Sequence, residues 1–170
     1  MNKIQKIVAG IGALSSLATV AHAQATDTAT ASGSVSIIQP IAASKVTDLT
    51  FGTIVKPSGG TATVSVDAAG ARTLDGTVAV GGGAGAATFN VVGEGGSAFT
   101  VSVPSSFSMT SGSNSLVVST VDNAAGGGTL SGTIGNASTA SFGVGGNFTL
   151  NSATTSGAYT GTFAITASYN

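Results

Sequence analysis

The chain has 170 residues, of which only 6% are charged, and its formal net charge is −1. An average soluble domain has about a quarter of its residues charged, and this composition lacks the basic clusters on which nucleic-acid binding depends. Cysteine is absent and the single histidine is His22. Disulfides are therefore excluded, and the rest of the chain lacks both the common zinc ligands, Cys and His, and the base of a nucleophile–histidine triad.

The first residues have the pattern of a bacterial secretory signal peptide. Two lysines precede an apolar run over residues 7–20, and small residues follow up to Ala25. We expect cleavage after Ala23 or, alternatively, after Ala25. An anchoring helix is the other reading, but the run is shorter than the roughly 20 residues that span a bilayer. The sequence thus predicts a signal peptide at 1–23 and one exported domain at 24–170, without a membrane span. This domain would pass through the periplasm to the cell surface or the medium.

Strand-like segments separated by turns occupy the rest of the chain, and we expect no helix. Val, Thr, Ile and Phe are frequent within the segments, whereas Gly, Ser, Asn and Asp are frequent between them. The expected strands are residues 34–39, 48–55, 61–67, 72–80, 87–93, 98–104, 115–121, 129–135, 140–151 and 157–170. Residues 105–114 are expected to be a looser connection. Short strands at regular spacing predict an all-β antiparallel sandwich of about seven to ten strands.

Residues 157–170 have the clearest strand pattern. Their side chains alternate with a period of two, which places one set on each face of an extended strand. The more apolar set is Gly157, Tyr159, Gly161, Phe163, Ile165, Ala167 and Tyr169. A strand that pairs within its own sheet explains this alternation as well as one that a partner recognises.

The same segment resembles the carboxy-terminal motif of chaperone–usher pilus subunits, because Tyr169 is penultimate and Gly157 is fourteenth from the end. In that family each subunit lacks one strand of an immunoglobulin-like sandwich. A periplasmic chaperone holds the subunit first, and the N-terminal extension of a neighbouring subunit later fills the gap. The physical basis is β-strand addition, in which main-chain hydrogen bonds supply affinity and alternate side chains fill pockets.

This resemblance implies that residues 157–170 are an assembly strand and that residues 26–38 are a candidate donor strand. The alternating positions of the candidate donor are Ala29, Ala31, Gly33, Val35 and Ile37. Since the first three are small, either the donor reaches as far as Ile37 or the chain completes its own sandwich. The implied partners are other copies of the chain or related subunits, a periplasmic chaperone and an outer-membrane usher.

A second resemblance covers nearly all of the expected mature chain. The stretches KVTDLTFGTI, FGVGGNFTL and SGAYTGTFAITASYN are similar to a family of exported bacterial domains of unknown function, number 4402. Members of this family are small, secreted, all-β and pilin-like. The resemblance therefore implies an immunoglobulin-like or pilin-like β-sandwich.

No motif with catalytic or ligand-binding chemistry stands out. The glycine runs at 81–86 and 142–148 do not complete a phosphate-binding loop. The acidic residues lie beside small or turn residues, without a carboxylate pair for glycoside cleavage or the close spacing of a calcium loop. We therefore expect no enzyme activity, no cofactor and no metal site.

Two functions remain as hypotheses. The first is a structural subunit of a secreted surface filament or pilus-like assembly, held together by β-strand exchange. The alternative is a self-contained secreted β-sandwich, an adhesin or matrix protein with carbohydrate as its candidate ligand. The chain has no Trp and only two Tyr, which leaves few residues for an aromatic sugar-binding platform. An amyloid of the curli type would need Gln- and Asn-rich repeats, which are absent.

Overall fold

The computed structural model describes residues 26–124 and 126–170, so the expected signal peptide lies outside the described residues. The chain divides into two units between Val35 and Ser36. Residues 26–35 are exposed and form no strand. Ser36–Asn170 is an all-β unit, and its described part contains no helix. The all-β class and the antiparallel sandwich predicted from the sequence are confirmed.

The described residues form twelve strands, more than the seven to ten expected. They are β1 (Ala42–Thr47), β2 (Thr53–Val55), β3 (Thr61–Val66), β4 (Arg72–Asp75), β5 (Val78–Gly81), β6 (Ala87–Glu94), β7 (Ala98–Ser102), β8 (Ser106–Ser111), β9 (Asn114–Asp122), β10 (Gly127–Thr129), β11 (Ala137–Asn151) and β12 (Thr166–Tyr169).

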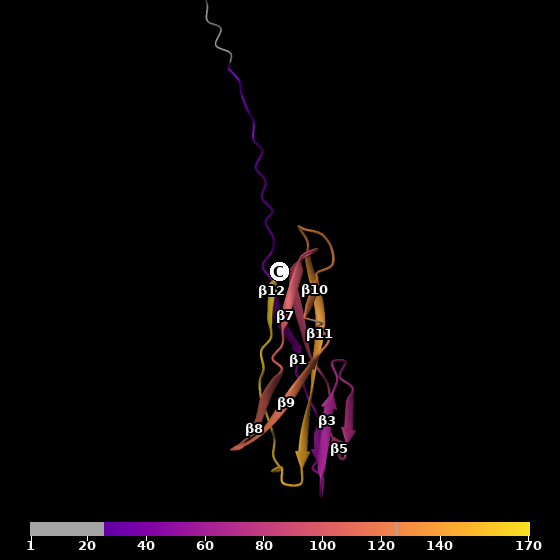
Figure 1. Ribbon diagram of the computed structural model, residues 1–170. Helices are drawn as coiled ribbons and strands as arrows, with labels where there is room; N and C mark the ends of the chain where they lie inside the picture. The colour runs from indigo at the N-terminus through magenta and orange to yellow at the C-terminus, as the bar shows by residue number, and fades with distance from the viewer. Residues whose placement is uncertain (1–25, 125) are drawn as a thin grey trace, which may run out of the picture. The chain divides into compact units, whose positions relative to one another are not determined.

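Three antiparallel sheets are built from these strands. The largest has the order β1-β6-β11-β3-β4, and β9 also pairs with β11 and carries β8 on its other side. A second sheet has the order β10-β7-β12, and a third contains only β2 and β5. Figure 1 shows β7, β10 and β12 together at the end of the unit where the C-terminus lies, with β3 and β5 at the opposite end.

The longest strand, β11, connects both ends of the unit. Residues 137–144 pair with β6, residues 144–147 pair with β9, and residues 146–151 pair with β3. Its middle is rich in glycine for a steric reason. A Cβ on Gly143 would overlap the carbonyl oxygen of Ala68, and a Cβ on Gly145 would overlap that of Val66. The run at 142–148 is therefore a place of close main-chain approach in a sheet.

Two apolar clusters form the core. The first, here called the upper core, has Phe89, Phe99, Phe142 and Val144 among its buried members. The second, the lower core, has Phe51, Val64, Val66, Val118, Phe148 and Leu150. Strand β11 contributes to both, since alternate residues such as Phe142 and Val144 point inward near one end and Phe148 and Leu150 near the other.

The first expected strand, residues 34–39, is absent, and that prediction is wrong. From residue 26 onward, the first strand is β1, in whose range the sequence predicts no strand. All six side chains of β1 are exposed. An edge strand of small and polar residues that is solvated on both faces shows no apolar alternation, so the pattern that reveals other strands is missing here.

The expected strands at 48–55 and 72–80 were too long. The first is reduced to β2 and an isolated bridge between Thr50 and Gly85. The second is divided into β4 and β5 by Gly76, whose φ of 71° turns the chain. A glycine in this left-handed region is typical of a turn, so the sequence contained a signal for the break.

Two further predictions need correction near the second half of the chain. Residues 105–114 contain β8, which forms a hairpin with β9. Phe107 and Met109 alternate there with exposed Ser and Thr, a period-two signal that the serine content obscured. In contrast, only the first residue of the expected strand 129–135 belongs to a strand, because β10 ends at Thr129.

The glycine-rich middle of β11 leads to a stability prediction. Gly145→Ala should lower the free energy of unfolding by about 1–3 kcal/mol, because the methyl group meets a main-chain oxygen that cannot rotate away. Gly59→Ala is the matched control, since no atom lies within 4 Å of a Cβ built there. The control should change stability by less than about 1 kcal/mol. Equal effects of the two variants in urea titrations would show that the close approach is unimportant.

Candidate functional site

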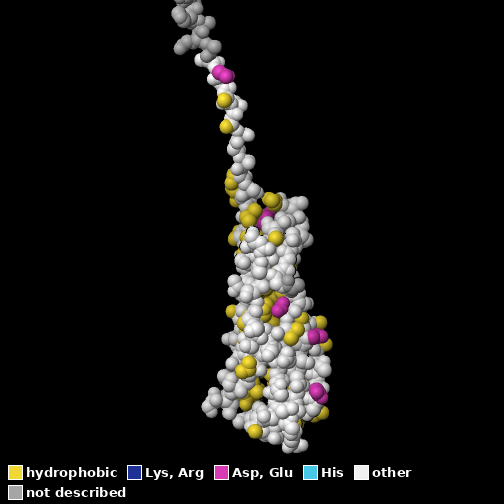
Figure 2. Space-filling view, viewed as in Figure 1, with side chains coloured by type: hydrophobic (Ala, Val, Ile, Leu, Met, Phe, Trp, Pro, Cys, Tyr) yellow, Lys and Arg dark blue, Asp and Glu magenta, His cyan; other side chains and the backbone are white. Residues whose placement is uncertain are grey.

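An apolar groove of about 1050 Å³ lies between the C-terminal segment and the stretch that leads into β2. Residues 154–163 form one border, and residues 48–54 form the other. Side chains of β8, β9 and β11 supply much of its lining. These are Phe107, Met109, Leu116, Phe148 and Leu150. Figure 2 shows hydrophobic side chains at the surface over β8 and β9, among mostly uncharged polar groups.

The C-terminal segment is a strand over a shorter range than expected. Only β12 is paired as a strand, and Thr160 makes an isolated bridge to Thr110. The expected strand at 157–170 is therefore wrong in its extent. Alternate side chains nevertheless keep two environments: Phe163, Ile165, Ala167 and Tyr169 are half-buried against the upper core, whereas the residues between them are exposed. Of the other predicted assembly residues, Gly157 and Gly161 are exposed and Tyr159 is half-buried.

A register mismatch interrupts the ladder between these two paired parts. Thr160 faces Thr110 and Thr166 faces Ser102. Thr160 and Thr166 are six residues apart in the C-terminal segment, whereas their partners Thr110 and Ser102 are eight residues apart. The residues between them therefore cannot all pair one to one. Pro104, which has no N–H to donate, lies in the longer stretch.

Residues 161–165 consequently have free main-chain groups. No hydrogen bond among the described residues involves their N–H or C=O groups. Thr160 bonds Thr110, and the Asn170 N–H donates to the carbonyl oxygen of Ala98. Because main-chain groups of successive residues point to opposite sides of an extended chain, those of the odd-numbered residues face away from β7 and β8. We call residues 161–165 the open edge.

The groove has few charged groups at its rim. Lys56 Nζ donates to the main-chain oxygens of Ser152, at 3.1 Å, and Thr154, at 3.4 Å, and so joins the end of β2 to the turn before the C-terminal segment. Lys45 and Asp48 form an ion pair of 2.6 Å. Both side chains are mostly exposed, so the pair contributes little to stability.

The candidate donor segment, residues 26–38, forms no strand and makes no hydrogen bond to any other described residue. Val35 and Ile37 are each 84% exposed, while Ala29, Ala31 and Gly33 are exposed as well. Val35 and Ile37 are two positions apart and would share one face of a strand.

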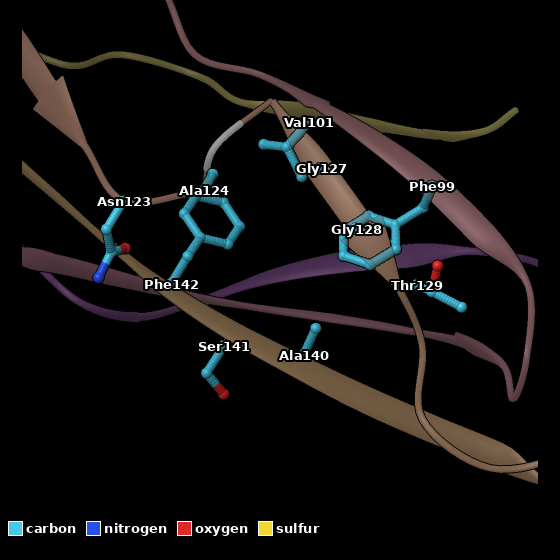
Figure 3. A pocket seen from close by; sticks show the side chains of 10 residues that line it. All are labelled: Phe99, Val101, Asn123, Ala124, Gly127, Gly128, Thr129, Ala140, Ser141 and Phe142. Atoms are coloured by element: carbon cyan, nitrogen blue, oxygen red, sulfur yellow. The ribbon is translucent and has the colours of Figure 1, made fainter.

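A smaller pocket of about 190 Å³ opens onto the upper core. The rings of Phe99 and Phe142 lie on either side of it (Figure 3). Two of its polar side chains already have partners, since Asn123 Oδ1 accepts from the Gly143 N–H and Ser141 Oγ donates to Asn90 Oδ1. Few polar side chains of this pocket are therefore left to bind a ligand.

No group of three or more metal-ligating His, Cys, Asp or Glu side chains occurs in the described part of the chain. Within the same residues, no helix has the length and apolarity needed to cross a membrane. The expectations of no metal, no cofactor and no enzyme activity stay predictions.

Glu94 has an environment that the sequence did not indicate, because it begins a glycine-rich turn and resembles an exposed loop acid. It is 1% exposed and is the one buried charged side chain among the described residues. Its carboxylate accepts hydrogen bonds from the N–H groups of Gln39 and Gly135. Main-chain donors at Gln39, Gly135 and Asn136 lower the pKa of Glu94 below its usual value. These donors come from segments far from Glu94 in the chain, so no local motif could have indicated them.

The lowered pKa of Glu94 predicts a pH-dependent stability. Ionised Glu94 stabilises the folded state above its unfolded-state pKa of about 4.5, and this contribution is lost as the pH falls through the lower folded-state value. Glu94→Gln should therefore be less stable than wild type at pH 7, and the difference should shrink in acid. Urea titrations at several pH values measure it. Asp48→Asn, at an exposed acid, is the control and should cost less than about 1 kcal/mol. A pH-independent difference for Glu94→Gln would contradict the prediction.

Phe163 connects the open edge to the core. Its ring centroid lies 4.9 Å from that of Phe107 and 5.9 Å from that of Phe89. Phe163→Asp should cost about 3–5 kcal/mol of unfolding free energy, because it removes these contacts and adds an unpaired charge. Thr162→Asp adds the same charge at an exposed neighbour and should cost less than about 0.5 kcal/mol. Equal costs in a denaturant titration would mean that this face is not part of the core.

Comparison with known proteins identifies the family of the chain. Residues 41–169 match the family described as "Domain of unknown function (DUF4402)". No curated protein and no solved structure matches the chain. The matched residues include all twelve described strands, because the match begins one residue before β1 and ends with β12. The resemblance predicted from the sequence is thus confirmed, and the chain belongs to the DUF4402 family.

Proposed function

We propose that this protein is a structural subunit of a secreted, pilus-like surface filament, in which a strand from one copy adds to the open edge of the next. The observation that carries the proposal is the open edge itself, which borders a large apolar groove. An exposed edge with free main-chain groups is a template for pairing with another chain. Its role is assembly rather than catalysis.

Strand addition would use both the open edge and the apolar groove. An incoming strand can bond the free N–H and C=O groups of residues 161, 163 and 165, which face away from β7 and β8, while every second side chain enters the groove. The lining contains Phe107, Met109 and Leu116, which are half-buried in the unit as it stands. Covering such side chains stabilises a complex by removing apolar surface from water.

The candidate donor, residues 26–38, suits this groove in polarity and charge. Burying the exposed side chains of Val35 and Ile37 contributes about 1.5–3 kcal/mol each. The segment has one charged residue, Asp27, whereas the groove has Lys56 beside the paired charges of Lys45 and Asp48. This difference in sign favours approach of the donor.

The proposal includes the route to the surface. A signal peptide at 1–23 would direct export, and a periplasmic chaperone would cover the same edge until a neighbouring copy replaces it. An outer-membrane usher would then be the assembly partner. These partners follow from the resemblance of residues 157–170 to chaperone–usher subunits.

A self-contained secreted adhesin or matrix domain is the second candidate. One observation favours it, because β12 already pairs with β7 of its own unit. In that case the groove would stay free for a ligand such as carbohydrate, with Tyr159 as its aromatic residue.

Assembly of the exported chain tests the two candidates. The double variant Val35→Asp, Ile37→Asp removes the apolar face of the donor, and Ser34→Asp, Ser36→Asp is the matched control on its other face. Loss of about 3–6 kcal/mol per interface corresponds to at least a hundredfold weaker association. Light scattering after size exclusion should show multimers for the wild type and the control but monomers for the first variant.

Deletion of residues 26–38 should also give monomers, and a peptide with that sequence should then bind to them. Wild-type multimers should resist detergent until heated, because their strands are fully hydrogen bonded. A wild-type chain that stays monomeric at every concentration, with one cooperative thermal transition, would overturn strand exchange and favour the self-contained domain.

A further inference from the structure

Gln39 is held by both of its main-chain groups. Its N–H donates to Glu94 Oε2 at 2.9 Å, and its carbonyl oxygen accepts from Tyr169 Oη at 2.8 Å. Tyr169 Oη also accepts from the Glu94 N–H at 2.6 Å. Three segments that are remote in sequence therefore meet at one residue. We call Gln39, Glu94 and Tyr169 the anchor.

The anchor requires that the charged carboxylate of Glu94 be buried. Burial of the Glu94 carboxylate is offset by main-chain donors, the second of which is the Gly135 N–H on Oε1. Gly93 provides the space for the phenol, since a Cβ there would overlap Tyr169 Oη. Hydrogen bonds to an ionised acceptor are the stronger kind, so the Gln39 N–H is firmly held.

The position of the anchor along the chain is informative. No residue between 26 and 38 makes a hydrogen bond to another described residue, so Gln39 is the first tethered residue in this part of the chain. Pro40 follows, and β1 begins two residues later. Strand β1 is the edge of its sheet, pairs with β6 alone among the described strands, and buries none of its side chains.

An edge strand of this kind is easily peeled from its end. A pull on the chain ahead of β1 would load the pair Ala42–Val92 first and then each following pair in turn. Breaking ladder bonds one at a time needs less force than breaking them together. A tether at Gln39 prevents this, because the load passes into β6 through Glu94 and into β12 through Tyr169.

We infer that the anchor is a mechanical tether, which protects β1 from being peeled off β6 when the N-terminal segment is under tension. The source of tension rests on the proposed function, since a neighbouring copy would hold residues 26–38. The tether itself is a property of one unit and can be measured without assembly.

Hydrogen exchange tests the tether on monomers, in the Val35→Asp, Ile37→Asp background. Tyr169→Phe removes two bonds of the anchor, and Glu94→Gln presents an amide nitrogen to a main-chain donor. Both should speed exchange of the Gln39 and β1 amides by about tenfold or more. Gly145→Ala lowers the free energy of unfolding but leaves the anchor intact. It should speed exchange in β3 but not at Gln39 and β1, which separates release of β1 from general destabilisation.

Tyr159→Phe is the matched control. It removes the other tyrosine hydroxyl of the chain, which donates to the Thr155 carbonyl oxygen at 2.8 Å within the C-terminal segment. This variant should leave exchange of the Gln39 and β1 amides as in the wild type. Unchanged exchange there in both anchor variants would overturn the inference.

Single-molecule pulling measures the load directly. The chain has no cysteine, so Thr28→Cys and Ser131→Cys provide unique handles. Ser131 lies beside Gly95, at the end of β6 that pairs with the start of β1, so the pull separates Ala42 from Val92 first. The chain with an intact anchor should open in one event, whereas Tyr169→Phe should show an earlier lengthening at lower force, as β1 peels. Coincident traces would overturn the tether. A chain that never forms multimers would refute strand exchange but leave this result standing, so the two failures are distinguishable.

Discussion

The close main-chain approach in the middle of β11 is the constraint on which the rest of this structure depends. Gly143 and Gly145 let the turn after β3 and the strand β9 lie against the same short stretch of chain. The strand can then contribute Phe142 to the upper core and Phe148 to the lower core. With no cysteine in the chain, packing and strand pairing supply the stability that disulfides provide in many exported domains.

Strand pairing also shapes the candidate assembly site. Strands β7 and β8 follow one another along one side of the C-terminal segment, but the stretch between them has two residues too many for continuous pairing. The surplus leaves the main chain of 161–165 without hydrogen-bond partners in the described part of the chain, beside half-buried aromatic and aliphatic side chains. An added strand can bond this free main chain and cover the apolar groove beside it at the same time.

The protein has few charged residues, and the one buried charge among the described residues, that of Glu94, has a structural role. Glu94 binds main-chain donors of two other segments and thereby fixes the residue that precedes the edge strand. The other described charges lie at exposed positions, as in the pair of Lys45 and Asp48, except Arg72, which is half-buried and donates to the carbonyl oxygen of Phe51. A surface of Ser, Thr, Asn and Gly with few charges repels neighbouring copies weakly, which is compatible with a packed assembly.

The sequence by itself determined the all-β class, the strands at 61–67, 87–93 and 140–151, and which side chains of 163–169 face inward, because these depend on a local period of two. Only the tertiary structure decided where pairing stops. Strand β1 has no apolar face to reveal it, and the break at 161–165 depends on the register of a segment about sixty residues earlier. The burial of Glu94 likewise depends on Gln39 and Gly135, which no local pattern connects to it. Such features arise from pairings between distant parts of the chain, and a local pattern carries no information about its partner's register.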